Sequence, residues 1–247
     1  MTRRYFLQCS YKGTRYHGWQ VQPNAISVQE VFEKALTTIL REKIAVVGAG
    51  RTDTGVHASF FVLHFNVDEA EFDTEKLVYK LNSFLPADVA IQEIWRVDGE
   101  LHARFSALSR TYKYYISVSK NPFATETSMS YYKPLDIVQM NKAAEVLLDY
   151  EDFTSFSRLH TDVKTNNCKV VLAFWSEENK RLVFTIKADR FLRNMVRAIV
   201  GTLLEVGKGK LSVDGFKKII ELKNRGAAAA SAPAQGLFLT NIEYPDF

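Results

Sequence analysis

The order of helix-like and strand-like segments narrows the folds open to this chain more than any other feature. Ser27 and Glu30 form an S-x-x-E capping box, and apolar residues from Val28 to Leu40 then recur at helical spacing. Runs rich in β-branched and aromatic residues lie on both sides of this helix. Some of these runs follow one another directly, whereas others are separated by a helix. This order favours an α+β fold over strict βαβ winding.

Similar elements in a similar order occur twice, which predicts two α+β halves, residues 1–120 and residues 121–247. The boundary is expected in the polar stretch 121–134. Expected strands cover residues 5–11, 44–47, 59–66, 89–97, 106–117, 169–175, 182–188 and 237–244. Expected helices cover residues 28–40, 74–84, 136–148, 191–206 and 213–222, and Phe84 is expected to face inward. The alanine run at 227–230 is expected in a loop, because Pro233 and Gly236 follow it.

The composition is that of an ordinary globular protein, with 47% hydrophobic and 24% charged residues. No apolar run reaches the roughly 20 residues that a membrane helix needs, and the first residues lack the pattern of a signal peptide. The two cysteines, Cys9 and Cys168, have no CxxC spacing, which fits free thiols in a reducing cytosol. We therefore expect a cytoplasmic protein with no membrane partner.

The net charge of +4 is too small to predict nucleic-acid binding by itself. Its distribution is more informative, since residues 187–197 carry four basic side chains against the single carboxylate of Asp189. Such a cluster is either a solvated helix face or a contact for phosphates.

Residues 48–58, GAGRTDTGVHA, form a loop in which three glycines surround one aspartate and one arginine. Glycines allow the backbone to turn sharply and to approach a ligand closely. The loop has neither GK[ST] nor GxGxxG, so it is not a phosphate loop of either common type. It is either a tight turn capped by Asp53 or a site that presents Asp53 to a ligand. The histidines lack metal-ligand spacing, so no metal is expected, and His57 is expected to hold the loop by hydrogen bonds.

This motif, GRTDTGVHA, closely resembles the catalytic motif of the TruA family, the tRNA pseudouridine synthases A. Four further blocks resemble that family, in the family's order and over nearly the whole chain: FLQCSYKGTRYHGWQVQPN, HARFSALSRTYKYYI, FLRNMVRAIVGTLLEVGKGK and APAQGLFLTNIEYP. The resemblance implies the pseudouridine synthase fold. That fold is a mixed but mainly antiparallel sheet from two RRM-like or ferredoxin-like halves, with helices on one face.

The resemblance also implies roles for individual residues. Asp53 matches the catalytic aspartate, Arg51 an arginine that assists nucleotide flipping, Tyr112 the tyrosine that stacks on the uracil, Arg197 the basic partner of the aspartate, and Leu237 an apolar wall of the pocket. For three of these residues a plainer role remains open. Arg51 could pack the loop, Tyr112 could be a core strand residue, and Arg197 could contact a phosphate on the surface.

Pseudouridine formation suits a single carboxylate. The N1–C1′ bond of uridine breaks, the base turns and C5 joins C1′, so no atoms are gained or lost and no cofactor is expected. The carboxylate could attack C1′, attack C6, or remove a proton from the sugar to give a glycal. A guanidinium such as that of Arg197 would favour its charged form. The hydroxyl of Tyr112 could take part in removing the C5 proton.

The implied substrate is the anticodon stem-loop of tRNA, modified at positions 38 to 40 by a homodimer. Extruding a paired base costs a few kcal/mol, and Arg51 could fill the gap that the base leaves. The candidate contacts to the RNA backbone are Arg15, Lys187, Arg190, Arg193, Lys208 and Lys210. Two departures affect these contacts: the uniform alanine run, and TNNCKVV at 165–171, which lacks an expected arginine.

Two other classes of function compete with this isomerase. A nucleoside or glycoside hydrolase usually places two carboxylates about the scissile bond, and this loop has one. A non-catalytic structured-RNA-binding protein could use Tyr112 and Tyr114 on an RRM-like sheet. The intact RTD triplet, residues 51–53, argues against the second class.

Overall fold

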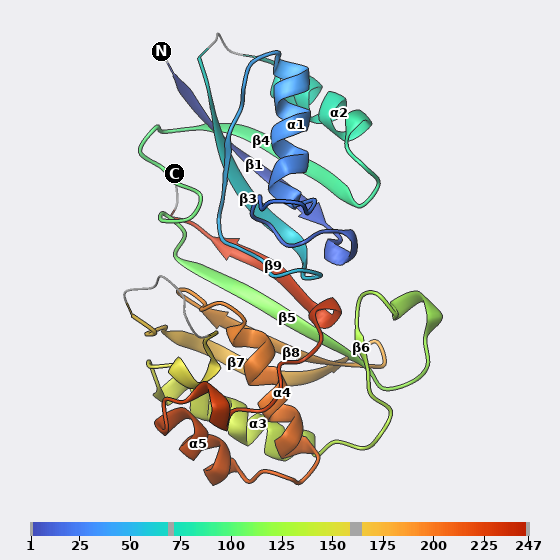
Figure 1. Ribbon diagram of the computed structural model, residues 1–247, viewed down its shortest axis with the longest axis vertical. Coiled ribbons are helices and arrows are strands. Elements are labelled where there is room, and N and C mark those ends of the chain that lie inside the picture. The colour runs from blue at the N-terminus through green and yellow to red at the C-terminus, as the bar shows by residue number, and fades with distance from the viewer. Residues whose placement is uncertain (1, 69–71, 159–164, 246–247) are drawn as a thin grey trace. The chain divides into compact units, whose positions relative to one another are not determined.

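The computed structural model describes residues 2–68, 72–158 and 165–245, and the chain forms two compact units (Figure 1). Unit 1 consists of Met1–Leu108 and Leu239–Phe247, and unit 2 of Ser109–Phe238. The two units are the parts of the chain that pack most compactly on themselves. The boundary expected between residues 120 and 121 concerns two similar halves of the sequence, and it stays a prediction.

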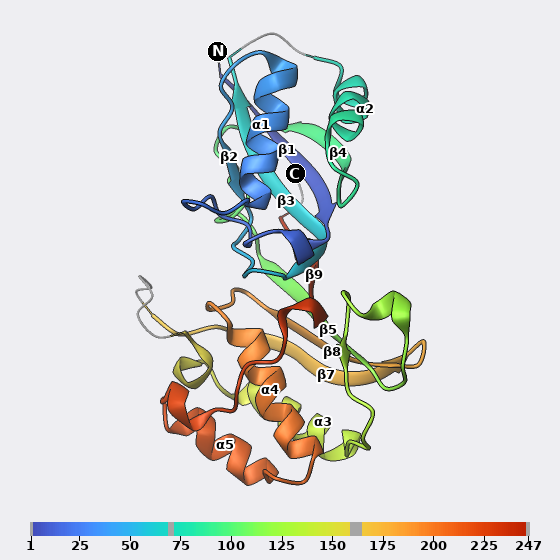
Figure 2. The ribbon, with the colours of Figure 1, turned by 45° about the vertical axis from the view of Figure 1, so that its right-hand side comes forward.

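Unit 1 is a sheet with α-helices on one of its faces, as Figures 1 and 2 show. Its elements are β1 (Arg3–Tyr11), α1 (Val28–Leu40), β2 (Val46–Gly48), β3 (His57–Val67), α2 (Thr74–Phe84) and β4 (Val89–Val97). The strands follow the order β4-β1-β3, β2 pairs with β3, and these pairs are antiparallel. Ser27 Oγ accepts the backbone N–H of Glu30 at 3.2 Å, which confirms the cap that begins α1.

Unit 2 has the same two-layer build, with α-helices on one face of its sheet (Figure 2). Its elements are β5 (Ser109–Ser117), β6 (Met129–Ser130), α3 (Ile137–Glu145), β7 (Val170–Glu178), β8 (Arg181–Ala188), α4 (Met195–Gly207), α5 (Val213–Glu221) and the start of β9 (Leu237–Glu243). The order β5-β8-β7 is antiparallel, and the short β6 runs parallel to β5. The expected α+β class and mainly antiparallel, mixed sheet are confirmed.

The start of α4 differs from the prediction. The helix expected from residue 191 begins at Met195, because Asn194 adopts a left-handed conformation with φ 66°. Arg190 and Arg193 therefore lie in the loop between β8 and α4 and not on a helix face. The apolar residues that extended the helical pattern, Phe191 and Leu192, belong to this loop.

Two smaller expectations were also wrong. The strand expected from residue 106 begins at Ser109, because Ser106 and His102 close a turn through two hydrogen bonds of 2.9 Å. Phe84 is 47% exposed, while Leu85 beyond the helix end is buried at 8%. The helix stops one residue before the apolar side chain that reaches the core.

Both cysteines are buried free thiols. Burial raises the pKa of Cys9 well above its usual value and raises the pKa of Cys168 to about 12. Neither thiol is therefore poised as a nucleophile. Over the described ranges, no helix combines the length and apolar character needed to cross a membrane.

Candidate active site

Asp53 lies in unit 1, in the loop that joins β2 to β3. Its carbonyl accepts the N–H of Val56 at 3.1 Å, which closes a tight turn over residues 53–56. Gly55 has φ 78° at the third position of this turn, a conformation that favours glycine. Asp53 is half-buried and Arg51 is exposed. The glycine-rich loop therefore makes a tight turn at this point, and the turn fixes the backbone of the aspartate.

The residue before Asp53 is held from two sides. Trp19 donates its backbone N–H to the carbonyl of Thr52 at 3.1 Å, and the hydroxyls of Thr52 and Tyr11 lie 2.9 Å apart in a buried position. Gly18, with φ 85°, passes so close that a Cβ there would stand 2.4 Å from the Thr52 carbonyl oxygen. The loop therefore rests on β1 and on the segment that precedes α1.

His57 closes the other side of the loop. It is fully buried, and its Nδ1 accepts the backbone N–H of Gly13 at 2.9 Å. The N–H of Gly55 donates to the carbonyl of Tyr16 at 3.3 Å. The expectation that His57 holds the loop by hydrogen bonds is confirmed.

A buried aromatic cluster packs around Trp19, the residue whose N–H binds Thr52 of this loop. Trp19 is 3% exposed, and its ring lies 4.3 Å from that of Phe61, centroid to centroid. Tyr11 and Phe32 complete the cluster at 6.4 and 6.2 Å from Trp19. Packing of this kind limits the motion of the loop.

Tyr112 lies in unit 2, on β5, in register with Ile186 of β8. Tyr112 is half-buried. Its ring packs edge to face against the ring of Phe191, with the two centroids 5.1 Å apart. Phe191 was not singled out from the sequence as part of the site. Its contact with Tyr112 could have been found only by placing it in the loop before α4, since the apolar pattern assigned it to the helix.

Arg197 and Leu237 also lie in unit 2. The Nε of Arg197 donates to the carbonyl of Ala232 at 2.8 Å, and the N–H of Ala232 donates back to the carbonyl of Arg197 at 2.9 Å. Burial raises the pKa of the Tyr114 hydroxyl, and the positive charge of Arg197 partly opposes this rise. Leu237 is 6% exposed and opens β9.

The six candidate contacts for RNA phosphates differ in their surroundings. Arg15 Nε pairs with Asp88 Oδ2 at 2.6 Å, and Lys208 pairs with Glu205 at 2.8 Å. Burial would raise the pKa of Asp88, but hydrogen bonds from Arg15 and Tyr16 outweigh it and lower that pKa. The others lie on β8, in the loop before α4 and after α4: Lys187, Arg190, Arg193 and Lys210.

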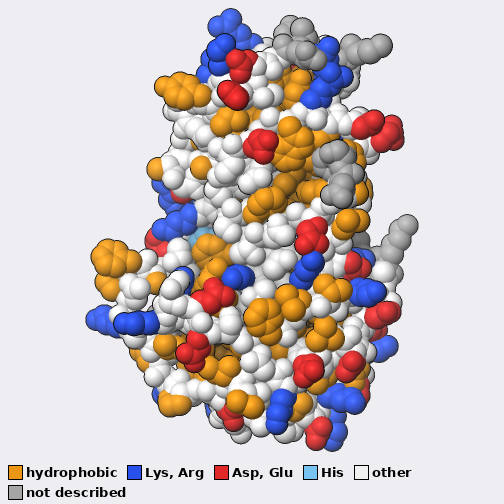
Figure 3. Space-filling model, turned by 180° about the vertical axis from the view of Figure 1, so that it is seen from behind, with side chains coloured by type: hydrophobic (Ala, Val, Ile, Leu, Met, Phe, Trp, Pro, Cys, Tyr) orange, Lys and Arg blue, Asp and Glu red, His pale blue; other side chains and the backbone are white. Residues whose placement is uncertain are grey.

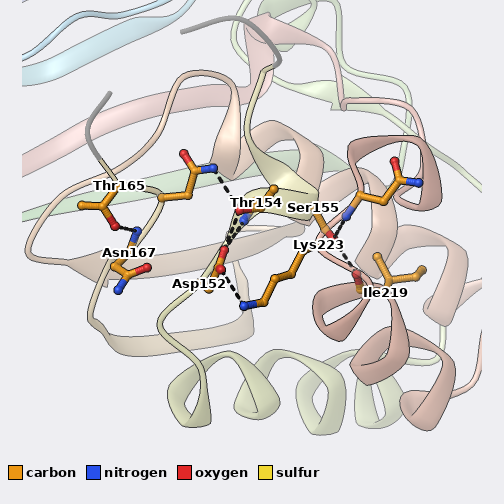
Figure 4. Close-up of polar contacts among 9 residues, drawn as sticks. Asp152, Thr154, Ser155, Thr165, Asn167, Ile219 and Lys223 are labelled. Carbon is orange, nitrogen blue, oxygen red and sulfur yellow. Dashed lines mark hydrogen bonds and ion pairs between the residues drawn. The ribbon is translucent and has the colours of Figure 1, made fainter. Parts of the chain in front are cut away.

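The segment that lacks the expected arginine has a structural role (Figure 4). Asn166 donates from Nδ2 to the hydroxyl of Thr154 at 2.9 Å, and that hydroxyl donates to Asp152 at 2.6 Å. Asp152 in turn pairs with Lys223 after α5 at 2.9 Å. These polar residues join the start of β7 to the end of α5. No group of three or more His, Cys, Asp or Glu side chains suited to a metal occurs in the part of the chain that the structure describes.

Comparison with known proteins identifies the family. The sequence model of the family described as tRNA pseudouridine synthase matches residues 9–106 and 143–245. Proteins named tRNA pseudouridine synthase A are 57% identical in Bacteroides fragilis, over 98% of this chain and 97% of the relative, and 54% identical in Bacteroides thetaiotaomicron, over 99% and 91%. One from Thermoanaerobacter pseudethanolicus is 40% identical over 98% of this chain and all of the relative. The chain therefore belongs to the tRNA pseudouridine synthase family, isomerases that convert uridine to pseudouridine.

Proposed function

We propose that this chain converts uridine to pseudouridine at positions 38 to 40, in the anticodon stem-loop of tRNAs, with Asp53 as the catalytic carboxylate. The observation that carries the proposal is the family match, which covers the Asp53 loop and most of both units. The hydrogen bonds that hold Thr52 and Val56 support it, because a reacting carboxylate must be fixed against its substrate.

Asp53 acts on the sugar or the base of a single uridine. As the N1–C1′ bond breaks, the carboxylate stabilises the separated base and sugar, either by a covalent bond or as a base for the glycal route. The uracil then turns and forms the C5–C1′ bond. The proton leaves C5 and a proton is gained at N1, so the product is an isomer of the substrate.

The other proposed residues position the uridine. Tyr112 stacks on the uracil and its hydroxyl assists removal of the C5 proton, while Leu237 supplies an apolar wall. Arg197 favours the ionised form of the carboxylate. Arg51, exposed two residues before Asp53, enters the RNA stem where the base has been extruded. We thus propose that all of these residues act on the same uridine as Asp53.

The proposed RNA path uses the basic residues around α4. Lys187 lies near the end of β8, Arg190 and Arg193 lie in the loop between β8 and α4, and Lys210 follows the helix. Contacts with phosphates orient the RNA without reading its sequence, so several tRNAs can serve as substrates. We further propose that the enzyme works in the cytoplasm.

A homodimer belongs to the same proposal. Ala173 and Trp175 of β7 are buried, so the alternating Leu172 and Phe174 face the opposite side of the sheet, where they are 40% and 38% exposed. Figure 3 views the molecule from behind, where hydrophobic side chains lie among charged ones. Apolar side chains on a sheet face without helices support association of two copies. Sedimentation equilibrium of the wild type and of Phe174→Lys tests this part.

Tritium release from tRNA that carries [5-³H]uridine tests the activity. Carbodiimide treatment and primer extension then map the product. Release with new stops at positions 38 to 40 is expected, and stops elsewhere would contradict the proposed substrate position. A folded protein that binds tRNA without releasing tritium would favour the alternative, a non-catalytic structured-RNA-binding protein.

A further inference from the structure

Residues 228–233, here called the alanine segment, form no helix or strand, yet other residues bind them along almost their whole length. They follow the short 3-10 turn Arg225–Ala227 and precede another at Ala234–Gly236. Six residues of unit 2 contact this backbone or its one serine hydroxyl: Arg225, Thr202, Gly201, Asn194, Arg197 and Tyr114. A segment held this closely can transmit the position of one side chain to another.

The alanine segment approaches helix α4 most closely at Gly201. A Cβ on residue 201 would stand 2.0 Å from the carbonyl oxygen of Ala230, so only glycine fits there. One residue further, the Thr202 hydroxyl accepts the N–H of Ala229 at 3.2 Å. The segment therefore lies directly on the helix that carries Arg197.

Arg225 holds the first part of this segment. Its Nη1 lies 3.3 Å from the carbonyl oxygen of Ala228 and 3.2 Å from that of Ala229, and its Nη2 donates to the Ser231 hydroxyl at 3.0 Å. The same hydroxyl accepts Nδ2 of Asn194 at 2.6 Å. The rigid fork of a guanidinium suits several acceptors at once, which a lysine cannot match.

The last part of the segment holds Arg197 and Tyr114, which lies two residues after Tyr112 on β5. The carbonyl of Ala232 accepts Nε of Arg197 at 2.8 Å, and the carbonyl of Pro233 accepts the hydroxyl of Tyr114 at 2.8 Å. These carbonyls belong to consecutive residues, so a shift of the segment would move both side chains. Tyr114 is fully buried and shares a face of β5 with Tyr112.

We infer that Arg225 is a positioning residue for the reaction: through the alanine segment it sets the direction of the Arg197 guanidinium. This inference rests on the proposed function, in which Arg197 acts on the catalytic carboxylate. Arg225 touches neither the substrate nor Asp53 in this account. It acts only through the carbonyls that Arg197 and Tyr114 bind.

The first test compares single-turnover rates of pseudouridine formation in wild type and Arg225→Ala, with tRNA affinity measured in parallel by filter binding. The expected result is a rate lowered by roughly 10- to 100-fold, the size of effect that misplacing a reacting group by about 1 Å produces. The dissociation constant for tRNA is expected to change less than about twofold, since Arg225 is proposed to touch no RNA. An unchanged rate would overturn the inference.

A double-mutant cycle separates positioning from general support of the fold. In an Arg197→Lys background the Nε donor is gone, so adding Arg225→Ala should cost less than about threefold in rate. A full additional loss in that background would show that Arg225 acts independently of Arg197, and would overturn the inference. Circular dichroism at the assay temperature confirms that each variant is folded.

A milder variant and a matched control keep the test decisive if Arg225→Ala unfolds. Ser231→Ala removes one acceptor of Arg225 and should lower the rate roughly two- to fivefold, with unchanged tRNA affinity. Lys217→Ala, an exposed cation on α5, should leave both quantities at the wild-type value. Equal rates for Ser231→Ala and Lys217→Ala would contradict the inference.

Failure of the inference and failure of the proposed function give different results. A rate near wild type for Arg197→Lys and for Arg197→Ala would contradict the role proposed for Arg197 itself. Slow Arg197 variants beside fast Arg225→Ala and Ser231→Ala variants would leave that role intact and overturn only the positioning by Arg225.

Discussion

The hydroxyl groups of Tyr11 and Thr52 lie 2.9 Å apart in the interior of unit 1, where the two residues are only 4% and 8% exposed. Tyr11 ends the first strand, and Thr52 directly precedes Asp53. One buried hydrogen bond thus connects the sheet to the side chain of the residue that directly precedes the proposed catalytic aspartate.

Tyr11→Phe should lower the free energy of unfolding by about 1 kcal/mol, because the Thr52 hydroxyl loses a buried partner. It should also slow the reaction several-fold by loosening the loop before Asp53. Urea unfolding and single-turnover rates measure the two effects, with Tyr79→Phe on the exposed face of α2 as the control. A variant as stable and as fast as wild type would show that this bond does not restrain the loop.

Stability should depend on pH through His64. Its Nδ1 accepts the N–H of Ala103 at 3.1 Å, and burial, with the charges of Arg4 and His102, lowers its pKa from 6.5 to about 4. Between these values the unfolded chain binds a proton that the folded chain does not, so stability falls as pH drops from 6.5 toward 4. The loss should reach about 2 to 3 kcal/mol.

Urea unfolding at a series of pH values between 7 and 4 measures this loss. His102, whose pKa is also lowered by burial and by Arg4, contributes in the same direction. His64→Gln removes the titrating group and should flatten the profile over this range. An equally steep profile in that variant would assign the pH dependence to other groups.

Tyr112 has two separable parts, an aromatic ring and a hydroxyl. Tyr112→Phe keeps the ring that meets Phe191, so tRNA affinity should stay within about twofold while the rate falls by roughly 100-fold, the scale of general base catalysis. Tyr112→Leu should lose stacking as well and weaken tRNA binding. Full activity of Tyr112→Phe would exclude the hydroxyl from removal of the C5 proton.

The basic residues should differ in their contribution to RNA binding. Lys210 is exposed after α4, so Lys210→Ala should reduce the slope of log Kd against log salt by about 1. Arg15 pairs with Asp88, so Arg15→Ala should change the slope less than half as much. Filter binding with tRNA from low to moderate salt measures both. Equal slopes for the two variants would contradict this ranking.

Local signals in the sequence predict much of the fold. Ser27 caps α1 as its capping box predicts, and the bounds of α2 and β4 agree with the predicted ranges 74–84 and 89–97. Capping and periodicity depend on neighbours in the chain, so they can be recognised without the fold. The late start of α4 could not be recognised in this way, because the left-handed Asn194 is fixed by its contact with Ser231.

At the candidate site, too, contacts between residues far apart in the chain could not be predicted from the sequence. Asp53, Tyr112 and Arg197 were selected from motifs that resemble a family, and the hydrogen bonds around Thr52 are what the fold adds. The alanine segment could not be interpreted from its composition. Its structural role depends on contacts with Gly201 and Arg225, and these contacts form only in the folded chain.

The most direct test of the account replaces the proposed catalytic carboxylate by its neutral isostere. Asp53→Asn is compared with wild type in single-turnover tritium release from [5-³H]uridine tRNA, with tRNA affinity measured by filter binding. Binding of tRNA is expected to stay within about threefold of wild type, while tritium release falls by a factor of at least about 10⁴, because the step has lost its nucleophile or base. Turnover of Asp53→Asn near the wild-type rate would contradict the assignment of Asp53 as the catalytic residue.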